Sequence, residues 1–131
     1  MKKVLVVDDE EKILTVLSAF ISHLGHQVDC ASNGDIAGEF LAATNYDLLV
    51  TDIQMPKCNG ITLLSRLKEL NGYQFPCKVI VMSGAASTEQ LEQLKVLVVD
   101  EFMPKPIQFN KLKIIMDELL VDNKEEKDSR T

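Results

Sequence analysis

Short, uninterrupted apolar runs alternate along the chain with longer segments in which apolar residues recur every three or four positions. Runs such as VLVV and VIVM, bounded by polar residues, are typical of strands that are buried on both faces of a sheet. The pattern predicts five strands, at residues 3–7, 27–31, 47–51, 78–82 and 101–103.

The segments between these runs have the spacing and the capping residues of helices. An apolar stripe from Ile13 to Leu24 predicts a helix that ends at Gly25. Asn33 and Ser87 are residue types that favour the N-cap of a helix. Together these signals predict five helices, at residues 13–24, 33–44, 60–70, 87–97 and 109–119.

Strand and helix alternate five times, which is typical of an α/β domain with a mostly parallel sheet. We expect one such domain over residues 1–121. After Val121 the sequence DNKEEKDSRT has nothing to bury. We therefore interpret residues 122–131 as a charged C-terminal tail or the start of a linker.

Composition narrows the classes of function. Of 131 residues, 46% are apolar and 26% are charged, the balance of a soluble globular domain. The net charge is −6 without a cluster of lysines and arginines, so we expect no direct binding to nucleic acid. No apolar run could span a bilayer, and the start MKKVLVVDD reaches acids too soon for a signal peptide. We expect a cytoplasmic protein without membrane contact.

Polar residues stand where four of the five predicted strands end. Asp8 and Asp9 follow the first strand, Asp52 the third, Ser83 the fourth and Lys105 the fifth. Ligands of open parallel sheets bind at the carboxyl ends of the strands. We therefore expect these five side chains to meet at one edge of the sheet.

The chemistry of this set suits phosphoryl transfer. Several carboxylates brought together repel one another unless a cation offsets their charge, and an all-oxygen site with open positions suits Mg²⁺. A lysine and a hydroxyl can neutralise and hydrogen-bond a transferring phosphoryl group. A remaining carboxylate can itself be the nucleophile and form an aspartyl phosphate.

Four motifs in order, VDDE, DIQMPKCNG, the strand-end Ser83 and FMPKP, carry a family resemblance. Over roughly residues 2–120, the chain resembles the receiver domain of bacterial two-component response regulators. The resemblance implies a flavodoxin-like, doubly wound (βα)5 sandwich. Its five-stranded parallel sheet would have the order 2-1-3-4-5 and be flanked by five helices.

The resemblance also implies a role for each matching residue. Asp52 corresponds to the phosphate-accepting aspartate, and Lys105 to the lysine that pairs with the phosphoryl group. Asp8 and Asp9 correspond to the metal-binding acids, with Asp52 and the backbone carbonyl of Gln54 completing the protein ligands of Mg²⁺.

Two further residues correspond to the switch of the family. The hydroxyl of Ser83 is expected to move toward the phosphoryl oxygen, and the ring of Phe102 to turn inward with it. The bond between Lys105 and Pro106 is expected to be cis, as it often is in similar domains.

The function implied is a signalling switch and not an enzyme. The chain would accept a phosphoryl group on Asp52 from a phosphohistidine of a sensor histidine kinase or histidine phosphotransfer protein. Phosphorylation would then change the surface formed by the fourth helix, fifth strand and fifth helix. An output protein, which the sequence does not identify, would bind that surface, or two copies of the chain would dimerise through it. Docking of the donor is expected near Leu14 and the loops that carry Met55 and Pro104.

Two other functions stay open at this point. One is a receiver-like binding module that is never phosphorylated. The other is a Mg²⁺-dependent phosphatase of the haloacid dehalogenase type, which expects an acid two residues after its nucleophile, where this chain has Gln54. We interpret Glu10 and Glu11 as acids in the first turn of a helix, where the helix dipole stabilises negative charge. We expect them to have no part in metal binding.

Overall fold

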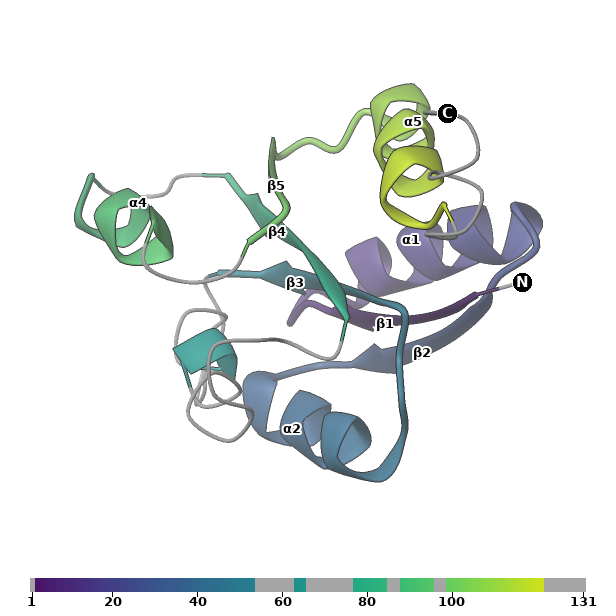
Figure 1. The fold of residues 1–131 in the computed structure, drawn as a ribbon, viewed down its shortest axis with the longest axis horizontal. Coiled ribbons are helices and arrows are strands. Elements are labelled where there is room, and N and C mark those ends of the chain that lie inside the picture. The colour runs from purple at the N-terminus through teal and green to yellow at the C-terminus, as the bar shows by residue number, and fades with distance from the viewer. Residues whose placement is uncertain (1, 54–62, 66–76, 85–87, 96–98, 122–131) are drawn as a thin grey trace, which may run out of the picture.

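A five-stranded parallel sheet lies between helices on its two faces (Figure 1). This computed structural model describes residues 2–53, 63–65, 77–84, 88–95 and 99–121. The strand order is β2-β1-β3-β4-β5, as the family resemblance implied. The strands are β1 (Lys3–Val7), β2 (Gln27–Ala31), β3 (Leu48–Asp52), β4 (Lys78–Ser83) and β5 (Glu101–Pro104).

Four helices accompany the sheet within the described residues: α1 (Glu11–His23), α2 (Gly34–Ala43), α4 (Thr88–Lys95) and α5 (Phe109–Leu119). None of these helices is long and apolar enough to cross a bilayer. Residues 63–65 are also helical. The rest of the helix expected at 60–70, the end of the fourth helix and the tail at 122–131 lie outside the described residues.

Each central strand is buried on both faces, which explains its continuous apolar sequence. Alternate side chains point to opposite faces of a strand. In β1, Leu5 and Val7 belong to the cluster that packs with α2, whereas Val4 and Val6 belong to the cluster that packs with α1 and α5. Figure 1 shows α1 and α5 together on one side of the sheet and α2 on the other.

The end of α1 and the cap of α2 carry the signals that the sequence predicts, whereas α1 begins at Glu11, two residues before the predicted start. Gly25 follows α1 with φ of 98°, a left-handed conformation that glycine adopts without strain. The side chain of Asn33 accepts a hydrogen bond from the backbone N–H of Ile36 at 2.9 Å, which caps α2. These local signals fix how the chain returns to the sheet after β1 and β2.

At the amino ends of the strands, a histidine takes part in a backbone contact. The backbone N–H of Lys2 donates to Nδ1 of His26, which precedes β2, at 3.2 Å. An imidazole can accept this hydrogen bond at Nδ1 only while that nitrogen is unprotonated. Burial accordingly lowers the pKa of His26 from its ordinary value of 6.5.

This contact predicts a pH dependence of stability. The folded protein holds fewer protons on His26 than the unfolded chain does, so the stabilisation is complete above pH 6.5 and is lost as the pH falls below it. We expect His26→Gln to flatten the decrease in the free energy of unfolding between pH 7.5 and pH 5.5, measured by urea denaturation. His23→Gln, at an exposed position in α1, is the matched control and should leave the decrease unchanged. Equal pH profiles of the wild type and His26→Gln would contradict this prediction.

Candidate functional site

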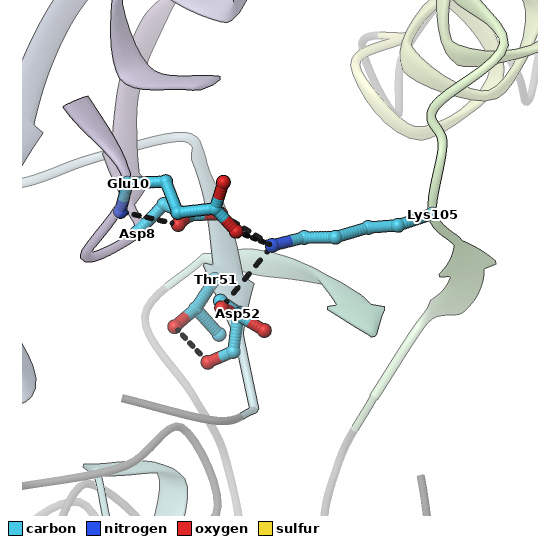
Figure 2. A network of polar contacts seen from close by, with 5 residues as sticks. All are labelled: Asp8, Glu10, Thr51, Asp52 and Lys105. Atoms are coloured by element: carbon cyan, nitrogen blue, oxygen red, sulfur yellow. Dashed lines mark hydrogen bonds and ion pairs between the residues drawn. The ribbon is translucent and has the colours of Figure 1, made fainter. Parts of the chain in front are cut away.

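One lysine joins two acids from distant strands at the carboxyl edge of the sheet. Asp8 follows β1, Asp52 is the last residue of β3, and Lys105 follows β5. The ammonium of Lys105 lies 2.8 Å from Oδ2 of Asp8 and 3.2 Å from Oδ2 of Asp52, as Figure 2 shows. Because β4 separates β3 from β5, the lysine side chain has to extend past the end of β4.

Both carboxylates are withdrawn from water. The side chain of Asp8 is fully buried and that of Asp52 is 6% exposed, while that of Lys105 is 16% exposed. Buried charges are costly unless they are paired. Burial by itself would lower the pKa of Lys105, but the hydrogen bond to Asp8 and the charge of Asp52 outweigh it and raise that pKa. The lysine is therefore a permanent cation at neutral pH.

Glu10 is a further neighbour of Lys105 that the sequence did not reveal. Its backbone N–H donates to Oδ1 of Asp8 at 2.8 Å, and its Oε1 lies 4.0 Å from the ammonium of Lys105. Glu11 lies in the first turn of α1, as expected, where the helix dipole stabilises a negative charge. The contact of Glu10 with Lys105 depends on the course of the chain after β5, which the sequence pattern does not give.

The three aspartates fit a small, hard cation. Carboxylate oxygens of Asp8, Asp9 and Asp52 all lie within 4.8 Å of one another. Opposite ligands of one Mg²⁺ are about 4.2 Å apart, so small side-chain rotations bring these oxygens into ligand range. Asp9 is exposed, so one side of this set is open to water. The predicted ligand Gln54 lies outside the described residues.

The structure also places the two predicted switch residues. Ser83 ends β4, is 3% exposed, and its backbone carbonyl accepts a hydrogen bond from the N–H of Lys105 at 3.0 Å. Phe102, in β5, is partly buried against the cluster that includes α2. The bond between Lys105 and Pro106 is cis, as expected. Ser83 thus lies at the same edge of the sheet as the acids. Phe102 lies in β5, which β4 separates from the strand of Asp52.

An apolar groove adjoins the site between α1 and the segment that links β5 to α5. Its volume is about 270 Å³. The lining residues are Lys12, Ile13, Val16, Leu17, Lys105, Pro106, Ile107 and Phe109. Leu14, near which docking was expected, does not line the groove and instead packs against the core with α5. Val16 is the large hydrophobic residue of α1 that is exposed, with half of its surface in contact with water.

With this geometry in place, comparison with known proteins decides the family. The family model of the response regulator receiver domain matches residues 4–117. The chain belongs to this family. Receiver domains are signalling modules of two-component systems and not an enzyme family, so the phosphatase alternative is not supported.

Among curated proteins, the receiver domain is similar to parts of longer regulators. It is 30% identical over 120 residues to the DNA-binding transcriptional regulator NtrC of Azospirillum brasilense, a match that covers 92% of this chain and 24% of NtrC. It is 32% identical to the autoinducer 1 sensor kinase/phosphatase LuxN of Vibrio campbellii, with coverage of 92% and 14%. The chain thus spans less than a quarter of the length of either relative.

Solved structures agree in fold over nearly the whole chain. The receiver domain of a Francisella response regulator is 33% identical with a TM-score of 0.79, and the match covers 91% of this chain and 96% of that one. TrrA of Thermotoga maritima, solved in complex with Mg²⁺-BeF, is 29% identical with a TM-score of 0.79 and coverage of 92% and 100%. The order of the strands and their flanking helices are therefore those of the family.

The position of Lys105 predicts that it competes with a metal ion. Its ammonium contacts the carboxylates of Asp8 and Asp52, two of the three groups that could hold the ion. We expect Lys105→Met to bind Mg²⁺ about tenfold more tightly than the wild type, because removal of one positive charge near the ion relieves repulsion. Isothermal titration calorimetry at pH 8 measures the affinity.

Lys113→Met is the matched control for this prediction. It removes the same charge from α5, where Lys113 is exposed and pairs with Asp117 at 3.0 Å. We expect its affinity for Mg²⁺ to equal that of the wild type. A gain of the same size in both variants, or no gain in Lys105→Met, would show that Lys105 does not compete for these oxygens.

Proposed function

We propose that this receiver domain is a phosphorylation-activated switch that accepts a phosphoryl group on Asp52 with the help of Mg²⁺. The observation that carries the proposal is the ammonium of Lys105 held between Asp8 and Asp52 at the carboxyl edge of the sheet. The likeness to TrrA, solved in complex with Mg²⁺-BeF, supports an ion at the same edge. Asp8, Asp9, Asp52 and the backbone carbonyl of Gln54 would hold it, and when bound it neutralises charge on the phosphoryl oxygens.

The transfer itself needs little from the protein beyond position and charge. An oxygen of Asp52 attacks the phosphorus of a phosphohistidine, the P–N bond breaks, and the histidine nitrogen keeps the electron pair and takes up a proton. Lys105 then pairs with a phosphoryl oxygen, because its ammonium is already within 3.2 Å of the acceptor carboxylate. Phosphorylation of this kind replaces one buried negative charge with about two.

The added charge is what turns the switch. In this proposal the hydroxyl of Ser83 moves to a phosphoryl oxygen and the ring of Phe102 turns inward, which changes the surface formed by α4, β5 and α5. That surface carries the signal to an output protein or forms a homodimer. The domain acts in the cytoplasm, where a kinase presents its phosphohistidine.

Acceptance of phosphate on Asp52 is tested by intact mass after incubation with acetyl phosphate. We expect one added phosphoryl group that requires Mg²⁺ and is absent in Asp52→Asn, because the amide is not a nucleophile. Asp35→Asn, at an exposed position in α2, is the matched control and should be phosphorylated like the wild type. Mg²⁺-dependent labelling of Asp52→Asn would overturn the assignment of the acceptor. No labelling by acetyl phosphate or by any histidine kinase would favour the unphosphorylated binding module.

The apolar groove supports a sensor kinase or phosphotransfer protein as the donor. Lys105 lines the groove and also contacts Asp52, so a helix seated there can present a histidine close to the acceptor. The lining is apolar apart from Lys12 and Lys105, which suits the apolar face of an amphipathic helix. The proposed docking surface is therefore centred on Ile13 and Val16, close to the predicted position at Leu14.

A charge in the groove separates protein donors from small ones. We expect Val16→Asp to lower the rate of transfer at least tenfold from the fastest donor in a panel of autophosphorylated histidine kinases, because burying an unpaired carboxylate is costly. Labelling by acetyl phosphate should persist. The control is Ile114→Asp, which makes the same kind of change at a residue of α5 that is 59% exposed and outside the groove. Unchanged transfer to Val16→Asp, measured by quenched-flow autoradiography, would remove the groove from the docking surface.

A further inference from the structure

Glu10 places a negative charge beside the phosphorylation site, at the side that is open to water. Its side chain is 63% exposed, whereas those of Asp8 and Asp52 are almost fully buried. We infer that Glu10 is a specificity-determining residue that slows phosphorylation by small, highly anionic donors. The inference rests on the proposed function of Asp52 as acceptor.

The backbone of Glu10 is fixed by the site, but its carboxylate has no ligand role in the described arrangement. The backbone N–H donates to Oδ1 of Asp8 at 2.8 Å, which holds Glu10 at the start of α1. The carboxylate reaches Lys105 only at 4.0 Å, compared with 2.8 Å for Asp8 (Figure 2). Glu10 is therefore positioned by Asp8 and faces the cation from the solvent side.

The charges of the site explain why this position matters. Asp8, Asp9, Asp52 and Glu10 contribute four negative charges, and Lys105 contributes one positive charge. A divalent ion leaves this set net negative, and the surplus that Glu10 adds lies near the surface. An approaching phosphoryl donor is itself an anion, so its repulsion grows with its charge and falls as salt screens it.

The repulsion acts differently on small and large donors. Acetyl phosphate carries about two negative charges at neutral pH and has little apolar surface, so it gains no contacts in the apolar groove that would offset the repulsion by Glu10. When it reacts, a bond forms between an oxygen of Asp52 and phosphorus, the bond from phosphorus to the acetyl oxygen breaks, and acetate leaves. A protein donor gains binding free energy from contacts with the apolar groove. The repulsion by Glu10 therefore lowers its rate of transfer less than that of acetyl phosphate. Glu10 thus favours a docked partner over a free metabolite.

The test compares Glu10→Gln with Glu11→Gln, which removes one charge from the neighbouring exposed position. Intact mass gives second-order rate constants for acetyl phosphate, which carries about two negative charges, and phosphoramidate, which carries about one, at saturating Mg²⁺. At low ionic strength, we expect Glu10→Gln to raise the rate constant of phosphorylation about fourfold with acetyl phosphate and about twofold with phosphoramidate. Both gains should shrink toward one at 0.5 M salt. Glu11→Gln should match the wild type, and Glu10→Asp should keep the low rate with acetyl phosphate.

The outcomes separate this inference from the proposed function. Equal rates in Glu10→Gln and Glu11→Gln, or the same acceleration for both donors at every salt concentration, would overturn the role of Glu10 while leaving Asp52 as the acceptor. Absence of labelling in the wild type with both small donors and with every kinase tested would overturn the proposed function and the inference together.

Discussion

The contact of one ammonium with two buried carboxylates is the constraint on which the carboxyl edge of the sheet depends. Asp8 and Asp52 lie at the ends of neighbouring strands, and each would cost several kcal/mol to bury without a counter-charge. The cation comes from Lys105, 97 residues after Asp8 in sequence. In this arrangement the acids at the ends of two buried strands are neutralised by a lysine that follows β5 at the same edge.

The same contact explains how a small chemical change can spread. In the described arrangement the ammonium of Lys105 pairs with a carboxylate oxygen of Asp8 and one of Asp52. Any group that binds either oxygen therefore changes the partners of the lysine. The N–H of Lys105 is also hydrogen-bonded to the backbone of Ser83, which ties the end of β4 to the chain after β5. Lys105 thus connects Asp52 to the ends of both β4 and β5.

Sequence alone predicted most of this fold because local signals and tertiary packing agree. The bounds of β1 and β2 are those predicted from the sequence, and Asn33 caps α2 as its residue type suggests. The third strand was predicted one residue too early. Asp52 pairs in the ladder with Met82, although a carboxylate disfavours a strand, because Lys105 neutralises it.

The candidate site was predicted less completely, for a physical reason. Strand ends and motif spacing identify Asp8, Asp52 and Lys105, because parallel strands bring their carboxyl ends to one edge. The proximity of Glu10 depends instead on where a flexible lysine side chain ends after crossing β4, and no sequence pattern distinguishes Glu10 from Glu11. Lys105 lines the groove as well as the acid site, so a helix seated beside it limits where that ammonium can lie. In the proposed function, recognition of a partner and the chemistry on Asp52 would therefore act through the same side chain.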